Sequence, residues 1–128
     1  MRIVIESIPH DQQRYPTVGD WQFEEDGTLR VYVSHTTPDF DFLVGIHEAV
    51  EAWLCRKQGI TDDDVTAFDE AYEAARKDGD TSEPGDQPDA PYRREHRFAS
   101  SVERRRALEM HIDWIEYERR LTALGAPA

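Results

Sequence analysis

The chain has 128 residues, the size of one ordinary domain, so we expect a single domain over residues 1–128. Its 38% hydrophobic residues and three tryptophans can supply one core, which argues against a disordered chain. No run approaches the roughly 20 apolar residues needed to cross a bilayer, and the first residues do not resemble a signal peptide. We therefore expect a soluble, cytoplasmic protein without a membrane partner.

Charge and cysteine content narrow the classes of partner and site. The formal net charge of −12 repels polyphosphate, so nucleic acid is an unfavourable partner. Six arginines lie between residues 93 and 106, and we interpret them as a solvated helix face that pairs with acidic neighbours. The single cysteine excludes both an internal disulfide and a cysteine-rich zinc site. Any metal must be held by histidines and carboxylates.

The N-terminal part of the sequence predicts β-structure. Residues 2–8 are rich in β-branched side chains, and residues 19–34 alternate between apolar and polar types in the manner of a hairpin. We expect a small, three-stranded antiparallel sheet within residues 1–36, followed by helices, which is an α+β fold.

The register of the hairpin follows from keeping apolar side chains on one face. A two-residue turn at Asp26 and Gly27 would mix the faces, whereas a three-residue loop pairs Phe23 with Leu29. Gly27 then takes the left-handed backbone conformation, which costs glycine little. The residues predicted to share the buried face are Trp21, Phe23, Leu29, Val31 and Val33.

Three or four helices are expected after the sheet. Apolar residues recur at helical spacing from residue 39, and Gly59 follows as a natural stop. Thr61 before three aspartates predicts the start of a second helix, and Asp113 with Glu116 predicts the start of a last one. The predicted helices are 39–58, 61–77, 92–111 and 113–124, and a long acidic loop occupies 78–91.

The first predicted helix contains a His-Glu-x-x-Glu motif. Residues four apart lie one turn apart on the same side of a helix, so His47 and Glu51 can direct a nitrogen and an oxygen at one ion. On a helical projection both lie at the edge of an apolar stripe that includes Trp53. Glu48 lies one step nearer to solvent, and Cys55 lies on the polar side, where it is expected to be a bystander without an assignable base.

A third ligand must come from another part of the chain, because a catalytic zinc usually has three protein ligands and one open position. Among five histidines we prefer His96, which follows the long loop on the first turn of the third predicted helix. Glu103 lies on the same helix face and is expected as a fourth ligand or as a hydrogen-bond acceptor behind a ligand, and Glu95 is a second candidate. Zn²⁺ is the expected ion, with Mn²⁺ or Fe²⁺ as alternatives because Glu51 contributes oxygen.

Residues 44–118 contain five short motifs: Ile46-His47-Glu48-x-Val50-Glu51-x-Trp53-Leu54, Val65-x-x-Phe68-Asp69, Glu83-Pro84-Gly85-Asp86, Ala90-Pro91-Tyr92, and Glu95-His96 with Ala99 and Glu103. In these motifs the chain resembles a group of small uncharacterised proteins encoded by phages and prophages. The resemblance implies that the long loop and His96 belong with the helix motif, and that the protein works in the host-cell cytoplasm. It implies no activity.

A more distant resemblance is to zincin metallopeptidases. It depends on His47, Glu48 and the order of a sheet followed by the motif helix. It implies that His47, Glu51 and His96 are ligands and that Glu48 is the general base that activates a metal-bound water. Glu51 replaces the second histidine of the zincin motif, which weakens the case for catalysis more than the case for metal binding.

Several functions remain open at this point. The first is a minimal metal-dependent hydrolase of peptidase type, in which His35, Tyr92 or an arginine of the third helix would stabilise the substrate oxyanion. The alternative is a non-catalytic phage protein with a structural metal site that binds a host or phage protein partner. A metal-free acidic binder of a host factor is a third option. Pyrophosphohydrolase chemistry with magnesium is weaker, since Glu48 and Glu51 alone offer few carboxylates.

Overall fold

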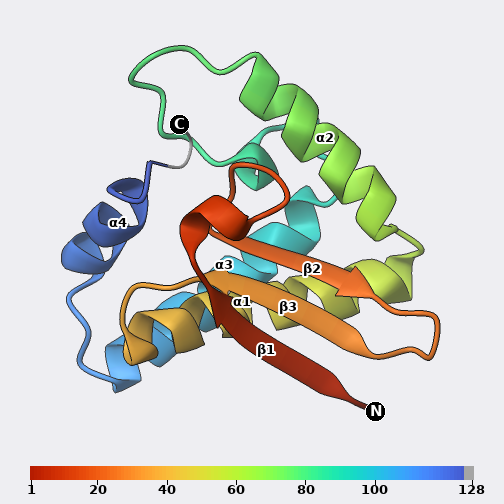
Figure 1. Ribbon diagram of the computed structural model, residues 1–128, viewed down its shortest axis with the longest axis horizontal. Helices are drawn as coiled ribbons and strands as arrows, with labels where there is room; N and C mark the ends of the chain where they lie inside the picture. The colour runs from red at the N-terminus through yellow and green to blue at the C-terminus, as the bar shows by residue number, and fades with distance from the viewer. Residues whose placement is uncertain (126–128) are drawn as a thin grey trace.

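The computed structural model describes residues 1–125 and has an α+β architecture (Figure 1). Its N-terminal part forms a three-stranded sheet, and the rest is mainly helical. The strands are β1 (Ile3–Ile8), β2 (Gly19–Phe23) and β3 (Leu29–Ser34). The α-helices are α1 (Pro38–Gln58), α2 (Asp62–Ala74), α3 (Arg93–Glu109) and α4 (Trp114–Thr122), and short 3₁₀ turns occur at His10–Gln12 and Pro84–Asp86.

The sheet is mixed, with the strand order β1-β3-β2. β3 is antiparallel to β2 but parallel to β1, so the expectation of an antiparallel sheet is wrong for β1. The segment 9–18 reverses the chain between β1 and β2, and the hairpin reverses it again. β1 and β3 therefore run in the same direction, and β1 pairs with β3 rather than with its neighbour in sequence.

The hairpin has the predicted register. Phe23 pairs with Leu29, and Trp21 pairs with Val31. The loop closes with a hydrogen bond from the backbone N–H of Glu24 to the carbonyl of Thr28, and Gly27 has a φ of 88°. On the predicted face, Phe23 is half-buried and the other four side chains are buried: Trp21, Leu29, Val31 and Val33.

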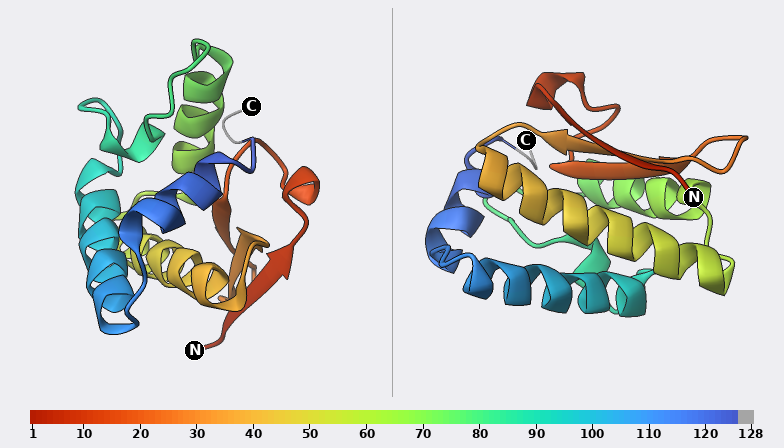
Figure 2. Two further views of the ribbon diagram at one scale, coloured as in Figure 1. Left: turned by 90° about the vertical axis from the view of Figure 1, so that its left-hand side faces the viewer. Right: turned by 90° about the horizontal axis from the view of Figure 1, so that it is seen from below.

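The helix α1 lies between the sheet and α3, which Figure 2 shows in its right-hand view. Because it is covered on two sides, its buried face is wider than the apolar stripe alone. His47 and Glu51 lie in the middle of this face rather than at its edge, and Glu48 and Cys55 are buried rather than turned to solvent. Trp53, expected in the buried stripe, is 40% exposed. The helical projection correctly predicted that Leu43 is buried. It misplaced the centre of the buried face, because it counted apolar residues alone.

Most helix ends follow the predicted signals, but α2, α3 and α4 are shorter than predicted. α1 ends at Gly59 with a φ of 75°, and α2 begins with a capping box between Thr61 and Asp64. α2 ends at Ala74 rather than at 77, because the following residues form turns. α3 ends at 109 rather than at 111, where His111 has a φ of 58° and the chain leaves the helix. α4 covers 114–122 rather than 113–124.

The arginine-rich part of α3 makes local contacts. Arg105 and Arg106 pair with Glu109, and Arg104 lies over the ring of Trp114. These contacts fit a solvated helix face. Within residues 1–125, none of the helices combines the length and the apolar character that a membrane crossing requires.

Candidate metal centre

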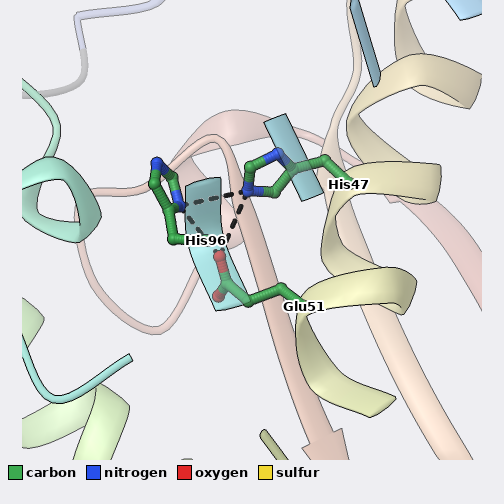
Figure 3. Close-up of side chains that lie close together, drawn as sticks. All are labelled: His47, Glu51 and His96. Atoms are coloured by element: carbon green, nitrogen blue, oxygen red, sulfur yellow. Dashed lines mark hydrogen bonds and ion pairs between the residues drawn. The ribbon is translucent and has the colours of Figure 1, made fainter. Parts of the chain in front are cut away.

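Three predicted ligands meet between α1 and α3 (Figure 3). His47 Nε2 lies 3.1 Å from Glu51 Oε2 and 3.2 Å from His96 Nδ1. Glu51 Oε2 and His96 Nδ1 are 2.9 Å apart. Two atoms bound to one tetrahedral zinc, at bond lengths of about 2.0–2.1 Å, are separated by about 3.3 Å. The spacing of the three atoms therefore fits a single ion, and all three residues are buried.

Each of the three side chains also forms a hydrogen bond through its other nitrogen or oxygen atom, which is not one of the three proposed ligand atoms. His47 Nδ1 lies 2.8 Å from Glu103 Oε1, and His96 Nε2 lies 2.9 Å from Glu83 Oε2. Glu51 Oε1 accepts a hydrogen bond of 3.0 Å from the indole N–H of Trp21 in β2. A carboxylate behind an imidazole keeps the proton on the nitrogen that faces it and leaves the other nitrogen free to bind a metal. All three groups are thereby oriented toward one point.

Glu103 connects the centre to the last helix. Its Oε2 atom accepts a hydrogen bond of 2.6 Å from the hydroxyl of Tyr117, which is fully buried in α4. Of its two expected roles, Glu103 takes the position behind His47 rather than a fourth ligand position. Glu95 is not brought into the cluster of ligand atoms. Sequence reasoning missed Tyr117, because nothing in its local pattern points toward residue 103.

A cavity of about 380 Å³ opens beside the ligands. Glu48 lines this cavity, is 91% buried, and has its Oε2 atom 3.7 Å from His47 Nε2. Among the described residues no group forms a hydrogen bond with its carboxylate. Burial, together with the negative charge of Glu51, raises the pKa of Glu48 well above its usual value. The centre thus has, next to open space, a buried acid group that accepts no hydrogen bond from the described residues and whose nearest charged neighbour is His47.

The carboxylates change the proton affinities of the ligands. Burial alone lowers the pKa of His47, but its hydrogen bonds to Glu103 and Glu51 outweigh burial and raise it. Burial likewise opposes the charge on His96, and the hydrogen bonds to Glu51 and Glu83 raise its pKa to about 10. For Glu51, burial is outweighed by the two histidines, which lower its pKa to about 2. Without an ion, the cluster holds protons that a metal would displace.

A second buried carboxylate lies in the cavity wall. Asp69 accepts hydrogen bonds from the hydroxyls of Tyr15 and Tyr92, and burial raises its pKa to about 7. The hydroxyl of Tyr92 is thus already engaged. His35, another expected oxyanion stabiliser, pairs with Asp41 and does not line the cavity.

Gly85 allows the 3₁₀ turn to lie directly against the imidazole of His96. A β-carbon at position 85 would come within 2.4 Å of His96 Cγ. We expect Gly85→Ala to displace His96 and to weaken zinc binding about tenfold to hundredfold. Competition with a chromophoric chelator would measure this change. Asp89→Ala, in an exposed part of the same loop, should keep the original affinity, and an unchanged affinity in Gly85→Ala would contradict the role given to this glycine.

Comparisons with protein-family models, with curated proteins and with solved structures find no match for the chain. The resemblances to phage-encoded proteins and to zincins stay expectations from sequence.

Proposed function

We propose that the protein binds one zinc ion through His47, Glu51 and His96 and uses it to hydrolyse a substrate, with Glu48 as the general base. The observation that carries this proposal is the buried carboxylate of Glu48, which lies beside the cavity and 3.7 Å from His47 Nε2 and, among the described residues, accepts no hydrogen bond. Structural zinc sites are usually closed by four protein ligands, whereas catalytic sites have three. Glu103, which the sequence suggested as a fourth ligand, lies on the far side of His47, at Nδ1. Manganese and iron(II) are alternative ions, because one ligand is a carboxylate.

The chain itself positions Glu48 for proton transfer. A bound zinc ion would polarise a water molecule or a substrate carbonyl. Glu48 lies on the cavity side of His47, where its carboxylate can accept a proton from water and deliver it to a leaving group. β2 holds this side chain in place, because a β-carbon at Gly19 would lie only 2.7 Å from Glu48 Cγ. Burial and the negative charge of Glu51 raise the pKa of Glu48, which strengthens it as a proton acceptor.

The charge of the cavity wall favours a neutral or cationic substrate over a phosphate ester. Its lining includes one arginine, Arg76, which pairs with Glu73. The carboxylates of the lining are those of Glu48, Glu51, Asp69, Glu73, Glu83, Asp86, Glu103 and Glu118. A polyphosphate would be repelled by this wall, which makes pyrophosphohydrolase chemistry the weaker option. The order of a sheet followed by the motif helix supports a substrate of peptide type, by likeness to zincins.

A structural metal site in a phage protein that binds a protein partner is the second candidate. It is favoured by the burial of all three ligands and by their position on two helices, which an ion would join. The two candidates differ in the open coordination position. We expect the visible spectrum of the cobalt-substituted protein to change when acetohydroxamate is added. An unchanged spectrum would favour the structural site.

Substitution of Glu48 tests the hydrolase directly. We expect zinc-loaded protein, but not metal-free protein, to hydrolyse p-nitrophenyl acetate or unfolded casein. Glu48→Gln should bind zinc as before but lower kcat/KM about hundredfold, because an amide cannot accept the proton. Glu70→Gln, which removes a carboxylate exposed on α2, is the matched control and should leave the rate unchanged. Equal rates in wild type and Glu48→Gln would rule out Glu48 as the base.

A further inference from the structure

The side of β1 that is turned away from β3 is an uncovered sheet edge. β1 stands at one end of the strand order, and residues 1–125 provide no strand beyond it (Figure 1). Ile3 and Ile5 are 44% and 41% exposed although they are apolar. Edge strands usually carry proline, lysine or a bulge that prevents pairing with another chain, and β1 contains neither proline nor lysine.

The hydrogen bonds to β3 determine which backbone groups of β1 face outward. The carbonyl of Arg2 accepts a bond from the N–H of Leu29, and the carbonyl of Ile8 accepts one from the N–H of His35. Successive residues of a strand direct their backbone groups to opposite sides. The even-numbered residues of β1 therefore bond to β3, and the odd-numbered residues present N–H and C=O groups at the free edge.

We propose that a second copy of this chain pairs with the free edge, so that two sheets join into one continuous six-stranded sheet. The two β1 strands run antiparallel about a two-fold axis at Val4. In this register Ile3 lies opposite the partner's Ile5, so that outward backbone groups of one copy bond to outward groups of the other. Arg2 lies opposite the partner's Glu6, and the symmetry repeats this pair on the other side of the axis.

The charges select this register over its neighbours. A shift by two residues would place Arg2 opposite the partner's Val4 or Ile8 and leave Arg2 and Glu6 without an opposite charge across the interface. On the opposite face, Ile3 and Ile5 of both copies would come together beside α1, where Ile5 already lies against Gly45. Phe42, one turn earlier on α1, is 48% exposed and lies on the same helix. Pairing would therefore cover apolar side chains that are exposed in a single copy.

Charge reversal gives a sharp test of this interface. Arg2→Glu and Glu6→Arg each place like charges opposite one another twice, so each variant alone should dimerise about tenfold more weakly than wild type. A mixture of the two variants restores both opposite-charge pairs and should form heterodimers. Analytical ultracentrifugation and native mass spectrometry would measure these species, with circular dichroism as the check that both variants fold.

Disulfide cross-linking tests the position of the proposed two-fold axis at Val4. Val4→Cys places two thiols opposite each other and should give a covalent dimer with oxidised glutathione, whereas Ile3→Cys, which faces the partner's position 5, should not. The native Cys55 is buried and does not compete. Wild type that stays monomeric at every concentration would overturn the proposal, as would a dimer unaffected by the charge reversals. The interface does not involve the metal centre, so its failure leaves the hydrolase proposal untouched.

Discussion

Zinc should raise the melting temperature of the metal-free protein by roughly 10 °C, and a chelator should reverse this change. The ion would bind the folded chain only, because its ligands at positions 47, 51 and 96 are brought together by the packing of α1 on α3. Protein purified without a histidine tag should contain one zinc ion per chain. Elemental analysis and differential scanning calorimetry would measure both quantities.

His47→Ala and His96→Ala should each abolish the zinc-dependent part of the melting temperature. The comparison is made within each variant, with and without zinc, so a loss of basal stability does not affect it. His35→Ala is the matched control, because His35 pairs with Asp41 away from the centre and should keep the full zinc effect. An equal zinc effect in His47→Ala would show that the ion binds elsewhere.

Zinc binding should also release protons near pH 7. In the metal-free protein, hydrogen bonds to carboxylates raise the pKa values of His47 and His96, the latter to about 10, so the cluster holds protons that zinc would displace. An ion needs the free electron pairs of His47 Nε2 and His96 Nδ1, while the other nitrogens keep their hydrogens toward Glu103 and Glu83. The affinity for zinc should therefore rise with pH. Calorimetry in two buffers of different ionisation enthalpy would count the protons.

The same protons give the metal-free protein a distinct dependence of stability on pH. The folded pKa of His96 lies above its ordinary value of 6.5, so its contribution is complete below about pH 6.5 and is lost as the pH rises toward 10. Glu51 behaves oppositely: its contribution is complete above its ordinary pKa of 4.5 and is lost as the pH falls toward 2. Zinc-loaded protein should not show the alkaline loss, because its histidines are already neutral. Urea midpoints that stay constant from pH 6 to 9 without metal, or binding without proton release, would contradict this account.

Local signals in the sequence predicted much of the fold. Gly27 and the alternation around it gave the correct hairpin register, and Thr61 and Gly59 marked helix ends correctly. The direction of β1 could not be predicted in this way, because it depends on how the segment 9–18 crosses the sheet. That path is set by contacts between residues far apart in sequence, such as the hydrogen bond between His10 and Ser34.

The candidate site could likewise be predicted only where its features depend on local sequence. The spacing of His47 and Glu51 placed them on one side of a helix, and that inference needs no tertiary information. The burial of Glu48 could not be predicted, because it requires knowing that α1 is covered by both the sheet and α3. The partner of Glu51 had a weak signal: Trp21 was expected in the core, and a buried indole N–H usually finds an acceptor.

The hydrogen bond from Tyr117 to Glu103 has a consequence for the order in which the protein matures during synthesis. All three proposed ligands have been added once residue 96 is in place, but the group that orients His47 is itself held by α4. A nascent chain that has not yet reached residue 117 would carry the ligands without this support. The centre would gain its full affinity for metal only late in translation, after most of the fold has already formed.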